Sequence, residues 1–518
     1  MTSALTRERA ATGGLAGRPD QALETDSGSG SGPPELWWRV TGPGLLVAAV
    51  CVFVGLDRAS LWRDEAYTLG AVHQLGPTLR ETSATMGLYY AVLSVWATVS
   101  DSIWWMRALS ALFALGALAL LGRLATGLVG SATARRACLF LGLSVLFVRY
   151  AQEARSYALV LLLTTASWLV LHRALAATDA EPARARRLWW LHTVLCTLMP
   201  LGHGLAALQV LAQPAALLAG RADRRAWVGA LPGVTGSLIV TAGLLTVGAS
   251  DVGNWIQPLN AGQIGDNASA FTSSSPPLML VLVALIGVGA VLALRRARSA
   301  TPGRVRTELV IPVAWAVVPP VLLLGLSIVR PSLVPRYLIG STPGVALLLA
   351  LACRRLDDAR GRVRLPLAAA LTGAVLLVGQ IGIHGPAGDD WRAAARTVAA
   401  RAEPGDRILL AESEVRPAFE AAWREVDDPP ALPLVNSPRP LGEVLRIEPL
   451  LADEESWIQA RDIERVWLVD EERAPERVQA LDFLTDPATG EPTHRLAGTW
   501  NADTGVTAHL LVRVDAPT

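Results

Sequence analysis

The stretch PPLMLVLVALIGVGAVLAL, residues 276–294, contains no charged residue and is followed directly by Arg295 and Arg296. An α-helix of ~20 apolar residues is long enough to cross the ~30 Å hydrocarbon core of a bilayer. The run therefore predicts a membrane-spanning helix. Similar runs recur along the 518 residues, of which 52% are hydrophobic and only 18% charged, and this composition excludes an ordinary soluble domain.

Eleven such runs predict a polytopic α-helical membrane domain over residues 37–385. Their apolar residues are continuous, without the alternation that a transmembrane β-barrel needs. The Gly/Ser/Pro-rich residues 1–36 predict a disordered cytoplasmic tail. The expected spans are roughly residues 40–57, 105–128, 136–150, 155–173, 188–202, 204–220, 226–249, 276–294, 308–328, 335–352 and 364–384.

A soluble α/β domain is expected over residues 386–518, where charged residues and Pro become frequent. Residues 389–402 predict its first helix, with an Asp cap and Gly405 just beyond the end. Short apolar runs at 407–411, 465–469 and 509–514 predict strands.

Arginines are unevenly distributed between alternate loops. Because short cytoplasmic loops retain positive charge, we expect the Arg-rich loops in the cytoplasm and the Arg-poor loops outside the plasma membrane. An odd number of spans then places the C-terminal domain outside as well. Residues 87–99 could form a twelfth span, but that would put the basic loops outside, so we expect an outer interfacial helix there. The basic loops lie near 135–136, 184–187, 221–225, 295–306 and 354–364, and the others near 58–104, 150–155, 250–275 and 329–335.

The first expected outer loop, residues 58–104, begins LWRDEAYTL and places Asp64 and Glu65 just after the first span. Inverting glycosyl transfer from a lipid phosphate needs one carboxylate that takes the proton of the acceptor hydroxyl. Asp64 could supply it. The alternative is that both acids cap the next helix.

The second outer turn reads RYAQEARSYAL and contains Glu153 and Arg155 between two apolar runs. Ionisable residues at membrane depth are costly, so they usually face a cavity or each other. We expect both side chains to point inward. The alternative is a structural ion pair between two helix ends.

Two further outer turns contain candidate residues. His203, in MPLGHGL, could be a metal ligand, a proton carrier or a hydrogen-bonded helix end. Arg336 and Tyr337 lie in VRPSLVPRYLIG, and an arginine can neutralise a phosphate bidentately. The alternative for Arg336 is an interfacial side chain that snorkels to the membrane surface.

The order of these motifs, with LYY at 88–90 and GDDWRAAARTVAARAEPGD at 388–406, resembles the GT-C superfamily of glycosyltransferases over about residues 40–415. More narrowly, it is similar to the actinobacterial mannosyltransferase-like branch of the protein O-mannosyltransferase and aminoarabinose transferase group. The resemblance implies an inverting, extracytoplasmic transferase with a polyprenyl-phosphate sugar as donor; mannose is the sugar it favours, and arabinose or another sugar stays open. The acceptor would be a protein, a glycolipid or a polysaccharide.

The resemblance also implies roles for individual residues. Asp64 would be the catalytic base, while Glu65 and Glu153 would support the acceptor or a divalent cation. The donor phosphate site would be lined by Arg155, Arg336 and Tyr337, and His203 would match the outer-tip His of the family, which helps to bind a metal in some relatives.

One segment departs from the family pattern. Many relatives carry an acid and a His or Asn, then a Pro pair, before LYY, whereas this chain has TSATMG with Ser83 and Thr85. A divalent-cation site would therefore be short of ligands.

Two other classes of function remain open at the level of sequence. Many spans with charged residues also describe transporters and lipid flippases, although such folds often show internal repeats and none is visible here. A non-catalytic cell-envelope scaffold is the other alternative. A formal net charge of +1 gives no reason to expect nucleic acid as a partner, whereas membrane lipids surround any such protein.

Overall fold

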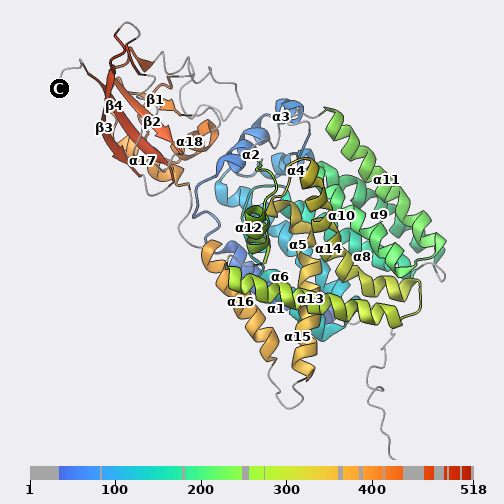
Figure 1. Ribbon diagram of the computed structural model, residues 1–518. Helices are drawn as coiled ribbons and strands as arrows, with labels where there is room; N and C mark the ends of the chain where they lie inside the picture. The colour runs from blue at the N-terminus through green and yellow to red at the C-terminus, as the bar shows by residue number, and fades with distance from the viewer. Residues whose placement is uncertain are drawn as a thin grey trace, which may run out of the picture.

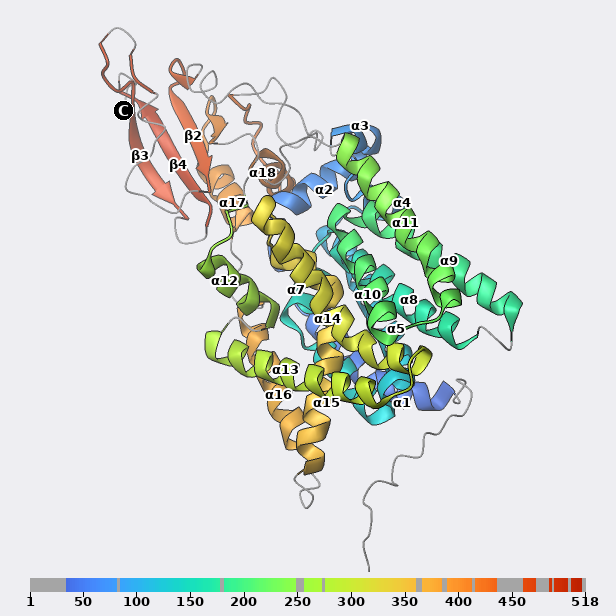
Figure 2. The same ribbon diagram turned by 45° about the vertical axis from the view of Figure 1, so that its right-hand side comes forward.

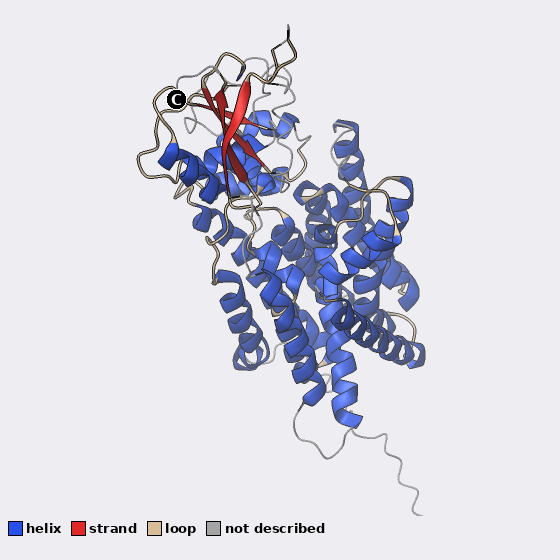
Figure 3. Cartoon of the chain, turned by 60° about the vertical axis from the view of Figure 1, so that its left-hand side comes forward, coloured by secondary structure: helices blue, strands red, loops and turns tan. Residues whose placement is uncertain are grey.

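The structure is a computed structural model in which helices form a bundle and a small sheet lies at one end of it (Figure 1; Figure 3). The prediction of a disordered tail concerns residues that lie almost entirely outside the described part, because helix α1 (Pro34–Phe53) begins at Pro34. The structure describes residues 34–81, 84–177, 181–247, 256–272, 275–359, 366–383, 389–411, 415–435, 460–471, 484–486, 489–501 and 505–514.

The bundle confirms a multi-pass helical membrane protein. Within the described ranges, six helices are long and apolar enough to cross a bilayer, and a seventh is obtained if the bent pair α6–α7 is one broken span. The count of eleven spans remains a prediction. The six are α5 (Ile103–Val129), α8 (Tyr157–Ala176), α11 (Arg224–Val247), α13 (Pro276–Ser299), α14 (Arg304–Val329) and the continuous η2 (Pro335–Ser341) with α15 (Thr342–Ala359).

Shorter helices complete the bundle. Helix α4 has ten residues, about 15 Å at 1.5 Å per residue, and is too short for the twelfth span considered from the sequence. Helix α12 occupies part of a segment expected as an outer loop. The shorter elements are α2 (Arg63–His73), α3 (Leu75–Glu81), α4 (Gly87–Trp96), α6 (Ser131–Gly142), α7 (Val145–Ala151), α9 (Pro182–Gly202), η1 (Gly204–Ala206), α10 (Ala207–Gly220), α12 (Ala261–Thr272) and α16 (Leu367–Ile383).

Two glutamines explain where the regular helices stop. Gln152 donates to the carbonyls of Cys51, Val52 and Val54, so α1 ends at Phe53, several residues before the expected end of the first span. The span expected over 136–150 is bent by 56° between α6 and α7. There the amide of Gln380 donates to the Leu143 carbonyl over 2.6 Å, which satisfies a backbone group freed by the break.

The C-terminal α/β domain has a four-stranded sheet in the order β1-β2-β4-β3. Strands β1 (Arg407–Leu410) and β2 (Arg465–Asp470) are parallel, while β4 (Thr507–Arg513) is antiparallel to both β2 and β3 (His494–Trp500). Helices α17 (Trp391–Arg401) and α18 (Arg416–Trp423) contribute buried Trp391, Val398 and Phe419 to the same core as Trp467 of β2.

The sequence predicted three of these strands and the first helix. Asp390 caps α17, since its carboxylate accepts from the Ala393 N–H over 3.0 Å. Strand β3 was not predicted, because only its first residue is buried and a bulge at Leu496/Gly498 disrupts its alternation.

The C-terminal domain rests on the first loop of the bundle. Helix α18 packs against α2, and Figure 2 shows the two helices adjacent at the junction. Arg63, the first residue of α2, pairs with Glu471 directly after β2, and Arg424 pairs with Asp101 over 3.3 Å. Both ion pairs join the domain to the end of the bundle that carries Asp64.

Candidate functional site

Asp64 is a partly accessible acid at this end of the bundle, and two arginines lie beside it. It lies in the first turn of α2, and its side chain is 28% exposed. Its Oδ2 is 3.3 Å from Arg155 Nη2 and 4.0 Å from Arg336 Nη2. Arg155 also donates to the Asp64 carbonyl over 3.0 Å, which fixes the guanidinium against the backbone of α2. The structure thus brings together three residues that are far apart in the sequence.

Glu65 has a different environment, although it is the next residue. Its side chain is buried, and Arg107 of α5 donates to both carboxylate oxygens over 2.8 and 2.6 Å. The Ala154 N–H donates to Oε1 over 2.7 Å. These hydrogen bonds tie α2 to α5 and to the turn before α8. The described hydrogen bonds show neither Asp64 nor Glu65 capping α2, whose N-cap is Trp62 without a side-chain cap.

Glu153 and Arg155 do not form the ion pair considered from the sequence. Arg155 pairs with Asp64, whereas Glu153 Oε1 lies 3.6 Å from Arg149 Nε, and its Oε2 is buried without a hydrogen-bond partner. Burial, with the nearby Glu65 charge, raises the pKa of Glu153 to about 8. At neutral pH this turn therefore carries mostly a neutral carboxyl group.

Aromatic rings surround the second arginine. The Arg336 guanidinium lies 5.6 Å from the Trp62 ring centroid and 5.8 Å from that of Tyr337, distances typical of cation–π contacts. Its side chain is only 15% exposed and faces Asp64. This geometry argues against a snorkelling interfacial residue.

His203 lies beneath these rings. Its ring centroid is 4.6 Å from that of Tyr337 and 5.9 Å from that of Tyr157. The Leu205 N–H donates to Nδ1 over 3.3 Å, which begins the short helix η1. Burial and the charges of Arg155 and Arg336 lower the pKa of His203 to about 3, so the ring is neutral. His203 therefore acts here as a hydrogen-bonded helix start.

The described residues do not assemble a divalent-cation site. Within them, no three His, Cys, Asp or Glu side chains converge as metal ligands would. Both oxygens of Glu65 are occupied, and Nδ1 of His203 accepts a backbone hydrogen bond. Of the segment that departs from the family pattern, Ser83 lies outside the described residues.

Several buried polar atoms on Arg155, its neighbour Ser156 and the Trp62 ring beside Arg336 have no hydrogen-bond partner among the described residues. They include Trp62 Nε1, Arg155 Nε and Ser156 Oγ. A buried unpaired donor costs about 1–3 kcal/mol, so such atoms mark positions where a ligand gains affinity. Near Asp64 and Glu153 there are three arginines, Arg155, Arg336 and the more exposed Arg149. The site therefore suits an anion that carries several acceptor oxygens.

Sequence reasoning missed three residues that build this site. Arg107 neutralises Glu65, Trp62 lies against Arg336, and the Tyr90 hydroxyl is 3.5 Å from Arg155 Nη1. The sequence could have identified Arg107 as a candidate, since a single charged residue inside an expected span usually has a buried partner or a function. The LYY motif was noted only for its resemblance, and its contact with Arg155 gives it a physical role.

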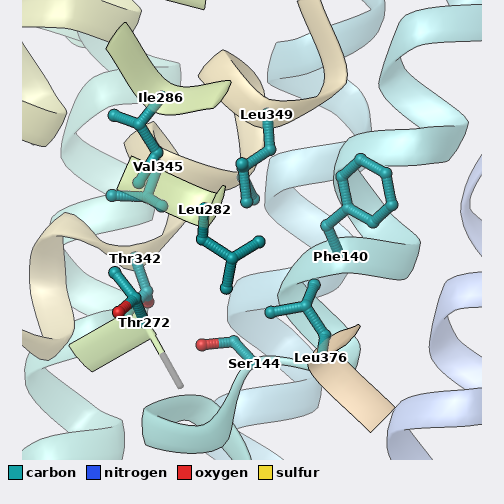
Figure 4. Close-up of a pocket in the computed structure, with 10 residues that line it drawn as sticks. Phe140, Ser144, Thr272, Leu282, Ile286, Thr342, Val345, Leu349 and Leu376 are labelled. Atoms are coloured by element: carbon teal, nitrogen blue, oxygen red, sulfur yellow. The ribbon is translucent and has the colours of Figure 1, made fainter. Parts of the chain in front are cut away.

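An apolar pocket opens beside α15. Figure 4 shows its lining, in which the hydroxyl groups of Ser144, Thr272 and Thr342 gather on one side and aliphatic side chains and Phe140 occupy the other. Thr342 follows directly after the 3₁₀ helix η2 that carries Arg336. Arg336 and Thr342 are six residues apart, which corresponds to about 12 Å at ~2 Å per residue of a 3₁₀ helix. The lining residues are Phe140, Ser144, Thr272, Leu282, Ile286, Thr342, Val345, Ala346, Leu349 and Leu376.

Comparisons with known proteins place the fold. No family model matches the sequence, and no curated protein matches it. ArnT from Cupriavidus metallidurans superposes with a TM-score of 0.58 in the apo state, with 15% identity over 91% of this chain and 97% of that chain. Its structure bound to undecaprenyl phosphate gives a TM-score of 0.56 with 15% identity, covering 93% and 100%.

A second neighbour is the archaeal oligosaccharyltransferase AglB from Archaeoglobus fulgidus, in complex with an inhibitory peptide and a dolichol-phosphate. It superposes with a TM-score of 0.53 and 10% identity over 93% of this chain and 75% of that chain. At such identities the likeness concerns the fold. The mannosyltransferase-like branch remains a prediction. The chain has the fold of the GT-C glycosyltransferases that these structures represent.

Proposed function

We propose that the protein is a membrane glycosyltransferase that moves a sugar from a polyprenyl-phosphate donor to an acceptor hydroxyl, with inversion at the anomeric carbon. The observation that carries this proposal is the partly exposed Asp64 carboxylate beside the guanidinium groups of Arg155 and Arg336. A base and a phosphate site are thereby within one side-chain length of each other. The reaction class needs this combination.

In the proposed mechanism Asp64 accepts the proton of the acceptor hydroxyl as its oxygen attacks the anomeric carbon. The bond between that carbon and the phosphate oxygen breaks, and the polyprenyl phosphate leaves with the bonding electrons. Arg155 and Arg336 stabilise the charge that grows on the leaving phosphate. Trp62 Nε1 and Ser156 Oγ are unpaired in the structure and can bind oxygen atoms of the sugar-phosphate.

Glu65 and Glu153 take supporting roles in this proposal. Because Arg107 occupies both oxygens of Glu65, that residue positions Asp64 and does not touch the substrate. Glu153 is mostly neutral, so it adds little repulsion to a phosphate bound beside Arg155. Tyr337 and His203 support Arg336 by ring contacts.

The known structures support the donor class. ArnT binds undecaprenyl phosphate, and AglB binds a dolichol-phosphate together with a peptide. Mannose as the sugar is proposed from the motif resemblance.

The distribution of arginine supports an extracytoplasmic site. Asp64, Arg155, His203 and Arg336 all lie in Arg-poor turns, whereas the Arg-rich loops belong to the other ends of the helices. We therefore propose that the site and the C-terminal domain face outward from the plasma membrane.

The test is sugar transfer by the purified protein in lipid nanodiscs, with polyprenyl-phosphate mannose or polyprenyl-phosphate arabinose and a cell-envelope acceptor fraction. Loss of a general base lowers the reaction rate by roughly 10²- to 10⁴-fold, so Asp64→Asn should reduce kcat by that factor. Asp101→Asn is the matched control, because Asp101 is an exposed acid at the same end and also pairs with an arginine. Full activity of Asp64→Asn would refute the role of Asp64, and donor movement between leaflets without transfer would favour a flippase.

A further inference from the structure

The loop that joins α1 to α2 is held through its peptide carbonyls. From the bundle side, Arg107 Nη1 donates to the carbonyls of Leu56 and Ala59 over 2.9 and 3.0 Å. Its Nη2 donates to the Ser60 carbonyl over 3.1 Å. The same guanidinium also neutralises Glu65, so a single side chain fixes this loop and the first turn of α2.

The remaining carbonyls of this loop are bound from the C-terminal domain. Arg392, in the first turn of α17, donates from Nη1 to the carbonyls of Asp57 and Arg58 over 2.6 and 3.3 Å. Its Nε and Nη2 bind the two oxygens of Glu425 over 2.6 and 3.3 Å. In addition, the Arg392 N–H donates to Ser60 Oγ over 3.2 Å.

Two arginines from different domains therefore bind five consecutive carbonyls, those of residues 56–60, and each arginine is neutralised by one glutamate. Asp64 follows this loop by four residues, while Arg155 belongs to the turn before α8. A shift of the loop consequently moves Asp64 relative to its arginine partner. The position of the acid depends on a contact that the C-terminal domain supplies.

We propose that Arg392 is a positioning residue. Through it the docked C-terminal domain holds loop 56–60 and keeps the Asp64 carboxylate at its position beside the Arg155 guanidinium. This inference rests on the proposed role of Asp64 as the base. It assigns the C-terminal domain a part in catalysis that needs no contact between that domain and the reacting atoms.

A nearby ion pair offers a control variant that weakens the domain junction without touching loop 56–60. Arg424 of the C-terminal domain binds Asp101 of the bundle over 3.3 Å, and among the described residues its hydrogen bonds do not reach loop 56–60. The side chains of Arg424 and Asp101 are 40% and 45% exposed, and such exposed ion pairs contribute little to stability. Arg424→Ala therefore removes a charge from the same junction without loosening the loop.

The first experiment measures kcat and the donor KM of Arg392→Ala and Arg424→Ala in nanodiscs. A misplacement of about 1 Å can cost roughly 10²-fold in rate, so we expect kcat of Arg392→Ala to fall by about 10- to 100-fold. The donor KM should change less than about twofold, because Arg155 and Arg336 belong to other segments of the chain, before α8 and in η2. Arg424→Ala should keep the wild-type kcat.

Chemical rescue distinguishes positioning from general damage. Guanidinium ion at millimolar concentration should restore part of the kcat of Arg392→Ala, since the vacated site is at the surface and keeps Glu425 and two free carbonyls. It should not affect Arg424→Ala. Equal loss of kcat in both variants, or a loss in donor KM alone, would overturn the proposal.

Hydrogen exchange provides a readout that does not depend on transfer. Amides of residues 56–66 should exchange faster in Arg392→Ala than in the wild type, while Arg424→Ala should match the wild type in this segment. Unchanged exchange in Arg392→Ala refutes the positioning role whether or not the protein is active. A wild type that is inactive with the donors offered, but shows the expected exchange, would instead count against the proposed function alone.

Discussion

Replacing Arg107 by alanine tests the buried ion pair on which the site depends. The side chains of Arg107 and Glu65 are 5% and 0% exposed, and two hydrogen bonds of 2.8 and 2.6 Å join them. Removal of the arginine leaves the Glu65 carboxylate buried with only the Ala154 N–H as a donor. Three loop carbonyls lose their donor at the same time.

The magnitude follows from these contacts. Breaking a buried ion pair from one side costs about 3–5 kcal/mol, and each backbone hydrogen bond that is lost adds about 1 kcal/mol. Since water enters a newly made cavity and the terms are not additive, we expect about 4–6 kcal/mol in total. In thermal unfolding this corresponds to a decrease in Tm of roughly 5–10 °C.

The assay is intrinsic tryptophan fluorescence during heating in nanodiscs, which is feasible because the chain has 17 tryptophans. Arg123→Ala is the matched control: Arg123 lies on the same helix, is exposed and contacts the Trp37 ring at 5.0 Å. It should cost about 1 kcal/mol or less.

A double variant identifies the cause of the loss. Replacing both partners, as in Glu65→Met with Arg107→Leu, removes the uncompensated charge, and such replacements of buried pairs are often neutral. The double variant should therefore be more stable than Arg107→Ala. If Arg107→Ala is within 1 kcal/mol of Arg123→Ala, the reasoning that this pair stabilises the first turn of α2 is wrong.

Two further predictions use the turn before α8. The pKa of Glu153 is raised to about 8, so its carboxyl loses its proton as pH rises through 8 and adds a negative charge beside the proposed phosphate site. The donor KM should therefore rise roughly three- to tenfold in transfer assays between pH 6 and 9. Glu153→Gln should remove this pH dependence. Gln152→Ala deletes the donor to three carbonyls at the end of α1 and should lower the free energy of unfolding by about 1–3 kcal/mol in the fluorescence assay, with little effect on the donor KM.

Long apolar runs made the helical bundle predictable, because burial of the backbone in lipid leaves few alternatives to a helix. The interruptions were not predicted. Gly142 and Ser144 flank the break between α6 and α7 and are the local signal for it, but the side chain that satisfies the break, Gln380, is 237 residues away in the chain. A local pattern cannot encode such a partner.

The sequence predicted some members of the candidate site but missed Arg107, Trp62 and Tyr90, and it did not predict which residues pair. The distribution of Arg grouped Asp64, Arg155 and Arg336 on one expected face, and the structure brings them together. The sequence left open, as the alternative, an ion pair between Glu153 and Arg155, whereas Arg155 binds Asp64, 91 residues earlier. Choosing between these partners depends on how α2 packs against the turn before α8, which is tertiary information.

The two adjacent acids show why residue type alone does not assign a role. Successive residues of an α-helix are rotated by about 100°, so Asp64 and Glu65 in the first turn of α2 must point in different directions. One direction leads to the buried Arg107 and the other to the partly exposed space beside Arg155 and Arg336. A carboxylate with both oxygens engaged is a poor base, while an accessible one next to a phosphate site is well placed. In the proposed mechanism, Asp64 of this pair does the chemistry while Glu65 holds it in position, and Arg392 would add a restraint from the C-terminal domain.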